Sequence, residues 1–358
     1  MRSWSLQRLS LLTLALAMLH GQVFAQDYPN RPITLVVPLA PGGAMDIVAR
    51  TIGQKLSERL GRAVVVENRV GGGTLVAAVS VAKAAPDGYT LMFTPGPTLT
   101  TNAAIYKNLP YDPRKDFVPI GLTSQVAFAL VVNPSLPVNS ITELVRYAKE
   151  KPGMLILASP GVATMPHLAG ELLMSKTGIE IRHAPYRGSP AALNDVVAGH
   201  VHMMFADPAI AVPLATEGKI RALGVSSRNR IGVLPELAPM AESGIPGFEA
   251  TNWHMIVAPA NTPTEIVQKL HAALMAVNAM PEVKQQIAKI GLLPMDSPSP
   301  EALRIFRPCS AKPEPCGRIL RRRRRTRATP REDGRASDTS GQTCVATPRC
   351  STDTGIPA

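Results

Sequence analysis

The feature that most restricts the fold is a short apolar run that leads through two glycines into a periodic apolar segment. The run is Ile33–Val37, the glycines are Gly42 and Gly43, and apolar residues then recur every fourth position at Val48, Ile52, Leu56 and Leu60. This order predicts a buried strand, a tight turn and an amphipathic helix that Gly61 ends. The helix would start at the mouth of a sheet, where its free N–H groups attract anions.

The same order recurs along the chain. A strand at Val64–Val66 is followed by Gly71–Gly73, an expected helix over Leu75–Ala84 and a strand at Thr90–Phe93. Further strands are expected at Met154–Ala158, Val201–Phe205, Ile220–Val225 and Met255–Ala258, and further helices at Thr164–Gly178 and Ser189–Gly199. Strands alternating with helices predict an α/β fold with mostly parallel sheets and right-handed crossovers. Ser140 with Glu143 and Thr262 with Glu265 are predicted capping boxes.

Two regions look weakly organised, because extended segments follow loops rich in Pro and Gly near residues 118–132 and 248–258. We interpret them as two crossings between domains. Residues 26–124 and 252–306 would then form domain 1 and residues 125–251 domain 2, with the ligand in the cleft between them.

The first 25 residues have the pattern of a cleavable signal peptide. Arg2 and Arg8 precede the apolar run Leu9–Leu19. Val23 and Ala25 supply small residues before a cleavage point. The run is shorter than the roughly 20 residues that span a bilayer. We therefore expect a mature chain that is soluble and exported.

The net charge of +12 is unevenly distributed. Residues 26–306 hold 24 basic and 21 acidic residues, whereas residues 307–358 hold 12 and 5 and contain all four cysteines. The body is therefore close to neutral and needs no disulfide. Nucleic acid is not an expected partner, although the run Arg321–Arg325 keeps a basic patch open as an alternative.

Three loops that follow strands and precede helices are candidates for an anion site: Pro41–Asp46, Gly71–Thr74 and Ser159–Thr164. In open parallel sheets ligands bind where such loops meet. The glycines fit neither G-x-G-x-x-G nor G-x-x-x-x-G-K-[ST], so no nucleotide is expected. Asp46 is either a helix cap or a contact to the ligand or its water, and the sequence leaves both readings open.

Signals for catalysis are poor. No G-x-S-x-G surrounds Ser159 or Ser189, and His200 with His202 lack a third metal ligand. His167 is interpreted as structural. We expect no catalytic residue, no metal site and no cofactor.

Seven ordered motifs within residues 26–306 closely resemble the receptors of tripartite tricarboxylate transporters, also called Bug receptors. These motifs are Tyr28-Pro29-x-Arg31-Pro32-Ile33, Val36-Val37-Pro38 with Pro41-Gly42-Gly43-x-x-Asp46, Val65-Val66-Glu67-Asn68-Arg69, Ala84-Ala85-Pro86-Asp87-Gly88-Tyr89, Leu109-Pro110-Tyr111-Asp112, His167-Leu168-Ala169-Gly170-Glu171-Leu172 and Pro185-Tyr186-x-Gly188-Ser189.

The resemblance implies a type II periplasmic binding protein fold of two α/β domains. Such a protein closes on a small carboxylate and delivers it to a membrane permease, and this chain is expected to act as a monomer. The ligand-binding residues that the resemblance implies are Pro41, Gly42, Gly43, Ala44, Met45, Asp46, Gly72, Gly73, Thr94, Gly96, Ser159, Gly161, Thr164, Tyr186 and Asp207. A sensory receptor for a carboxylate and an α/β enzyme acting on a carboxylic acid stay open as alternatives.

The chain departs from the family pattern in three places. Thr74 and Leu75 replace the usual continuation of the second glycine loop, and Val162, Ala163, Met165 and Pro166 stand where small polar residues are usual. We therefore expect a less polar pocket, suited to an aromatic or branched monocarboxylate. The third departure is residues 307–358, an aberrant Arg/Pro/Cys-rich tail that we expect to be disordered and to arise from a frameshift near residue 306.

Overall fold

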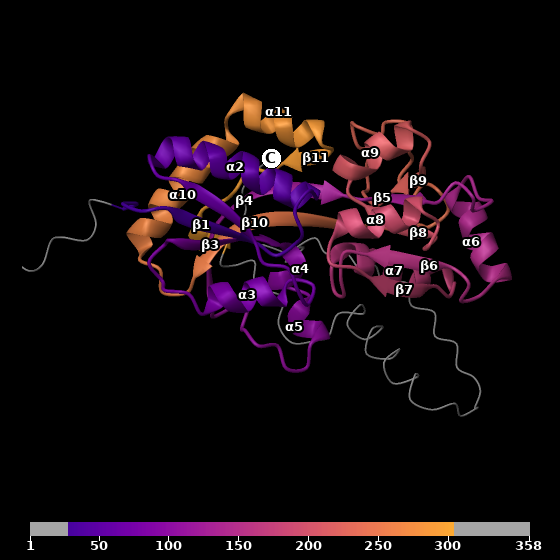
Figure 1. Cartoon of the computed structure of the whole chain (residues 1–358), viewed down its shortest axis with the longest axis horizontal. Helices are drawn as coiled ribbons and strands as arrows, with labels where there is room; N and C mark the ends of the chain where they lie inside the picture. Colours follow the sequence, from indigo (N-terminus) through magenta and orange to yellow (C-terminus); the bar gives the residue numbers. More distant parts are fainter. Residues whose placement is uncertain (1–27, 304–358) are drawn as a thin grey trace, which may run out of the picture.

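The computed structural model describes residues 28–303, which fold around two mixed sheets placed side by side (Figure 1). The predicted signal peptide and the predicted tail lie outside these residues. The first sheet has the order β11-β4-β10-β3-β1-β2, and the second β7-β6-β8-β5-β9. We call the first sheet with its helices lobe A and the second sheet with its helices lobe B.

Lobe A takes strands from both ends of the described chain. Its strands are β1 (Ile33–Val37), β2 (Val64–Asn68), β3 (Thr90–Pro95), β4 (Phe117–Ala127), β10 (Thr251–Pro259) and β11 (Leu292–Pro294). Its helices are α2 (Ala44–Leu60), α3 (Leu75–Ala82), α4 (Gly96–Leu99), α5 (Asn102–Ile105), α10 (Thr264–Asn278), α11 (Pro281–Lys289) and α12 (Pro300–Leu303).

Lobe B is built from the middle of the chain. Its strands are β5 (Ala129–Val132), β6 (Ile156–Ser159), β7 (Arg182–Pro185), β8 (Met203–Ala206) and β9 (Arg221–Val225). Its helices are α6 (Ile141–Glu150), α7 (Met165–Thr177), α8 (Ser189–Val197) and α9 (Pro208–Thr216).

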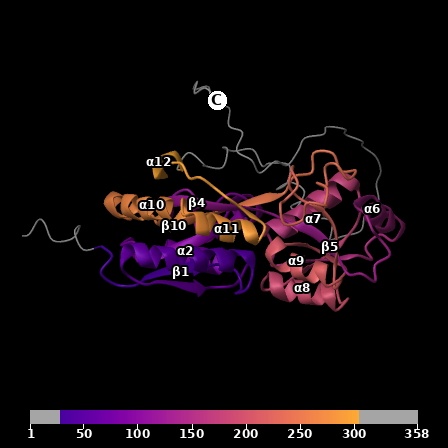
Figure 2. The same cartoon turned by 90° about the horizontal axis from the view of Figure 1, so that it is seen from above.

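Helices cover both faces of each sheet because the side chains of a strand alternate between faces. In β1, Ile33, Leu35 and Val37 pack with α2, α10 and α11, whereas Val36 packs with α3 and α12. In lobe B, α6 and α7 share a core with Leu130 and Val132 of β5, and α8 and α9 share one with Ala129 and Val131. Figure 2 shows α2, α10 and α11 next to one another within lobe A.

The two crossing regions contain the longest strands rather than weak structure. Strands β4 and β10 pair antiparallel from Phe117 opposite Pro259 to Ala127 opposite Thr251. Phe128 alone separates β4 from β5, so the chain passes directly from one sheet to the other. Our expectation of weak organisation here was wrong, because long antiparallel pairing with only two register irregularities orders both segments.

The prediction of parallel pairing holds for part of each sheet. Strand β1 pairs parallel with β2 and β3, and β6 pairs parallel with β7 and β8. The strands nearest the crossings pair antiparallel. The sheets are therefore mixed, since a chain that crosses twice enters and leaves lobe B in opposite directions.

Of the two predicted capping boxes, one forms. The Ser140 side chain accepts a hydrogen bond from the N–H of Glu143 at the start of α6. The other prediction was wrong, because the Thr262 hydroxyl donates to the carbonyl of Pro259 and α10 has no side-chain cap.

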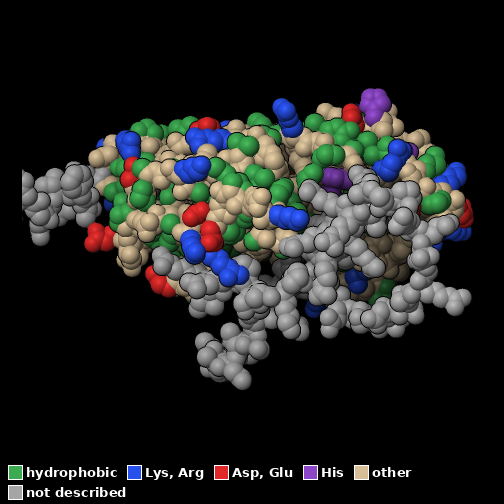
Figure 3. Space-filling view, turned by 90° about the horizontal axis from the view of Figure 1, so that it is seen from below, with side chains coloured by type: hydrophobic (Ala, Val, Ile, Leu, Met, Phe, Trp, Pro, Cys, Tyr) green, Lys and Arg blue, Asp and Glu red, His purple; other side chains and the backbone are tan. Residues whose placement is uncertain are grey.

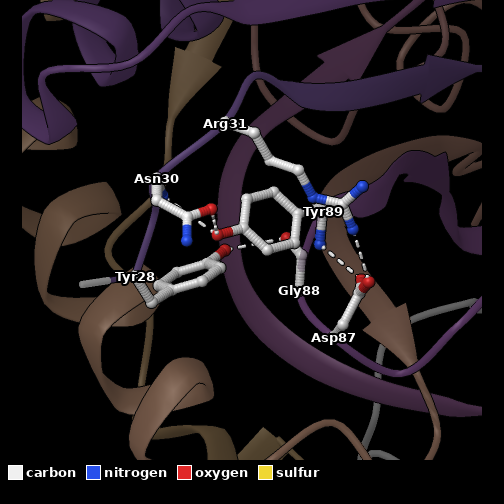
Figure 4. A network of polar contacts seen from close by, with 6 residues as sticks. All are labelled: Tyr28, Asn30, Arg31, Asp87, Gly88 and Tyr89. Atoms are coloured by element: carbon white, nitrogen blue, oxygen red, sulfur yellow. Dashed lines mark hydrogen bonds and ion pairs between the residues drawn. The ribbon is translucent and has the colours of Figure 1, made fainter. Parts of the chain in front are cut away.

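Two of the sequence motifs meet in a network of polar contacts (Figure 4). The Tyr28 hydroxyl donates to the carbonyl of Gly88, and Arg31 pairs with Asp87 at 2.7 Å. The ring of Tyr89 lies 4.2 Å beneath the guanidinium of Arg31. These motifs join the start of the described chain to the turn before β3, which is a structural role.

The described surface carries charges of both signs. Lys and Arg side chains are interspersed with Asp and Glu side chains on the face shown in Figure 3. Among residues 28–303, no helix combines the length and apolar character needed to cross a bilayer.

Candidate functional site

A cavity between the two lobes is the candidate site. Its empty volume is about 590 Å³, a figure that includes space open to solvent. Its lining is mostly apolar, with six polar side chains. It is lined by Leu39, Ala40, Gly43, Ala44, Met45, Thr74, Pro95, Pro97, Val126, Phe128, Pro160, Thr164, Met165, Pro166, Ser189, Asp207, Asn252 and His254.

The loop after β1 brings the start of α2 to this cavity. Gly43 is the N-cap of α2 and has no side-chain cap bond, and Gly42 before it has φ +84°, a conformation that favours glycine. Gly43, Ala44 and Met45 line the cavity. Uncapped N–H groups at the start of a helix favour an anionic ligand here.

Asp46 belongs to the support of this loop rather than to the cavity lining. Its carboxylate accepts hydrogen bonds from the N–H of Gly42 at 3.1 Å, from Arg50 at 3.0 Å and from Asn68 at 3.0 Å. Burial acts to raise the pKa of Asp46, but these hydrogen bonds outweigh it and the pKa is lowered. Asp46 therefore ties the loop to β2 as an ionised group.

Lobe B contributes the loop after β6. Thr164, the N-cap of α7, directs its hydroxyl to the carbonyl of Gly161, and Ser159 accepts from the N–H of Gly161. Ala163 has φ +67° and its N–H donates to Nδ1 of His167 at 3.1 Å. The loop is thus fixed by its own side chains, which leaves Pro160, Thr164, Met165 and Pro166 facing the cavity.

Two neutral histidines lie behind this loop. The rings of His167 and His183 stack with centroids 4.0 Å apart, and Nε2 of His183 lies 2.6 Å from the hydroxyl of Ser159. Burial lowers the pKa of His167 to about 3, with a further lowering from His183, and burial lowers that of His183 to about 4. His167 therefore acts as a hydrogen-bond acceptor, in agreement with its predicted structural role.

The long strand β10 contributes side chains that the sequence analysis missed. Asn252 Oδ1 accepts a hydrogen bond from the N–H of Gly96 at 3.0 Å, and His254 contacts the hydroxyl of Ser124 at 3.0 Å. Burial lowers the pKa of His254 to about 4, so the ring is neutral. No glycine loop or helix start marks these positions, because they reach the cavity only through the crossing between the lobes.

The lobes touch at glycines beside the cavity. A side chain on Gly73 of lobe A would overlap the carbonyl of Val162 in lobe B. A Cβ on Gly188 of lobe B would lie 2.5 Å from that of Ala40 in lobe A. The arrangement is therefore a closed one, with backbone packed against backbone across the cleft.

The structure distributes the predicted ligand-binding residues over four places. Gly43, Ala44, Met45, Thr164 and Asp207 line the cavity. Pro41, Gly42, Asp46, Gly72, Gly73, Ser159 and Gly161 belong to the segments that frame it. Thr94 and Gly96 flank the lining residue Pro95, and the N–H of Gly96 donates to Asn252. The Tyr186 hydroxyl donates to Asp195, and Tyr186 is not among the residues lining the cavity. Roles in binding stay predictions for all of them.

Comparison with known families decides what kind of protein has this cleft. The family model described as "Tripartite tricarboxylate transporter family receptor" matches residues 48–320. The chain belongs to this receptor family. The match extends beyond residue 306, where we placed the start of the aberrant tail.

Individual similar proteins agree with this assignment. A UPF0065 protein from the tcbD-tcbE intergenic region of Pseudomonas sp. (strain P51) is 40% identical over 290 residues, covering 80% of this chain and 86% of that protein. The structure of R. palustris Rpa4515 with adipate has 34% identity and a TM-score of 0.75, covering 84% of this chain and 97% of that one. The structure of the periplasmic binding protein BugD has 34% identity and a TM-score of 0.74, covering 82% and 96%. The receptor family thus has the periplasmic binding protein fold predicted from the sequence.

Proposed function

We propose that this protein is a periplasmic receptor that captures a small carboxylate between its lobes and delivers it to a tripartite tricarboxylate-type membrane permease. The observation that carries the proposal is the cavity between the lobes, at which the starts of α2, α7 and α8 meet an apolar lining. Helix starts attract a carboxylate, and the apolar lining accommodates a hydrocarbon part. The apparent signal peptide supports the periplasmic location.

The lobes would act as two domains that open and close about the two crossings. Domain 1 would comprise residues 26–124 and 252–306, and domain 2 residues 125–251. The protein would bind without catalysis and as a monomer. The apolar character of the loop Val162–Pro166 supports a monocarboxylate with an aromatic or branched body.

Calorimetric titration of the purified full chain with a panel of mono- and dicarboxylates tests this proposal. We expect one class of acid to bind with one-to-one stoichiometry, and mass spectrometry to find the same class of acid copurifying with the protein. The acid should be recovered unchanged after prolonged incubation. Absence of binding to every acid, or conversion of the acid into a product, would overturn the proposal.

A further inference from the structure

Among the described residues that line the cavity, Asp207 is the only Asp, Glu, Lys or Arg. It follows β8 as the N-cap residue of α9 and lines the cavity between the lobes. Its carboxyl hydrogen-bonds with Ser189, another lining residue. Asp207 therefore presents an acidic group to whatever occupies the cleft.

No basic side chain offsets this group within the described lining. Asp207 and His254 are the titratable residues among the described residues that line the cavity, and none of these is Lys or Arg. His254 is buried and neutral, because burial lowers its pKa to about 4. Burial likewise raises the pKa of Asp207 to about 6, the direction expected of a carboxylate without a cationic partner.

The favourable place for a ligand carboxylate lies elsewhere in the cavity. Helix α7, whose N-cap is Thr164, has no acidic residue in its first turn. By contrast, α2 carries Asp46 in its first turn, α8 begins at Ser189 beside the Asp207 carboxyl, and α9 is preceded by Asp207. The positive end of α7 is thus available to an anion, whereas an acidic group already lies at the starts of the other three helices.

We propose that Asp207 makes the cleft selective for a monocarboxylate that carries a hydrogen-bond donor, a hydroxyl or ammonium group, and that it disfavours a second carboxylate. The inference rests on the proposed function and narrows its substrate class. A donor group hydrogen-bonds to the Asp207 carboxylate, whereas a second carboxylate meets a like charge in a partly dehydrated site.

A matched series of ligands at pH 7.5 tests the selectivity by calorimetry. The series takes the aromatic or branched monocarboxylate of the wider panel that binds most tightly and adds a hydroxyl, ammonium or carboxylate group at the end remote from its carboxylate. We expect the hydroxyl or the ammonium compound to bind at least tenfold more tightly than the dicarboxylate. The two donor compounds also distinguish a neutral from a cationic donor.

The substitution Asp207→Asn provides the matched variant, because it keeps the shape and removes the charge. We expect the dicarboxylate to bind at least tenfold more tightly to this variant than to the wild type, and the hydroxyl compound to bind at least threefold more weakly. A cooperative thermal transition within a few degrees of the wild type shows that the variant has retained its fold.

The outcomes separate this inference from the proposed function. If the dicarboxylate binds the wild type as well as the hydroxyl compound does, and Asp207→Asn leaves both affinities unchanged, the selectivity role of Asp207 is refuted and carboxylate binding stands. If no carboxylate of the wider panel binds, both proposals fail.

Discussion

At the scale of single residues, Asp46 illustrates how a group beside a binding loop supports it without lining the cavity. It is 4% exposed and holds the N–H of Gly42 as well as the side chains of Arg50 and Asn68. The sequence analysis left a cap and a ligand contact open as readings. The three hydrogen bonds favour the first, because the carboxylate oxygens are already engaged within lobe A.

We predict that Asp46→Ala lowers the free energy of unfolding by about 2 kcal/mol, because hydrogen bonds to a buried charge are lost. The same substitution should change ligand affinity less than threefold. Urea unfolding and calorimetry measure the two effects. The folded-state pKa is lowered, so this stability is present above the unfolded-state value near 3.9 and is lost as pH falls through the folded-state pKa. The difference from wild type should therefore shrink below about pH 4.

Glu58→Ala is the control for this prediction, since Glu58 forms an exposed ion pair with Lys55 on the same helix. It should cost less than about 1 kcal/mol. A tenfold weaker affinity in Asp46→Ala with unchanged stability would instead make Asp46 a ligand contact.

The residues that could be predicted from the sequence are those with a local signature. Gly43 and Thr164 stand before helices, and their places at the cavity follow from chain order alone. Asn252 and His254 have no such signature, because their places depend on β10 running beside β3 and β4 across the lobes. Tyr186 was expected at the ligand on the basis of family resemblance, and its contact with Asp195 gives it a partner within lobe B.

At the scale of elements, helix–strand alternation was sufficient to predict α2, α7 and α8, but not the mixed pairing of the sheets. Apolar periodicity defines which face of an element is buried, not the direction in which neighbouring strands run. The direction of β4 and β10 follows from the two crossings, which are a property of the whole chain. The packing of a helix on its neighbouring strand depends on fewer residues than the direction of a strand does. Substitutions of single helical glycines can therefore test it.

We predict opposite effects for alanine at two helical glycines. Gly170 of α7 packs directly on Leu157 of β6, and an added Cβ would overlap that side chain. Overpacking of this kind costs about 1–3 kcal/mol, so Gly170→Ala should lower the melting temperature. At Gly53 of α2 the nearest atom to an added Cβ is a methyl of Val66 at 3.4 Å. Gly53→Ala should therefore stabilise the protein by up to about 1 kcal/mol through helix propensity.

Thermal unfolding of both variants checks this pair of predictions. A higher melting temperature for Gly170→Ala would contradict the prediction. It would mean that Leu157 or α7 can shift to accept the added Cβ without loss of stability.

At the scale of the whole molecule, the glycines between the lobes connect the fold to the proposed function. The loops that carry Gly73 and Val162 come from different sheets and meet beside the cavity. Ligand capture by closure requires such a contact to form on binding and to break on release. A backbone that approaches another backbone this closely tolerates no side chain, so the proposed closure would require glycine here in addition to the turn.

We predict that Gly73→Ala weakens ligand binding at least tenfold, equivalent to about 1.4 kcal/mol, because the added Cβ would overlap the carbonyl of Val162 and hold the lobes apart.

Gly72→Ala is the matched control. Both glycines have positive φ, +57° for Gly72 and +78° for Gly73, so both substitutions strain the loop. A Cβ on Gly72, however, meets only Leu75 of its own lobe. Gly72→Ala should therefore lower stability yet retain affinity within threefold. Small-angle scattering with saturating ligand should give a larger radius of gyration for Gly73→Ala than for Gly72→Ala. Equal affinities and equal radii would show that closure at this contact does not contribute to binding.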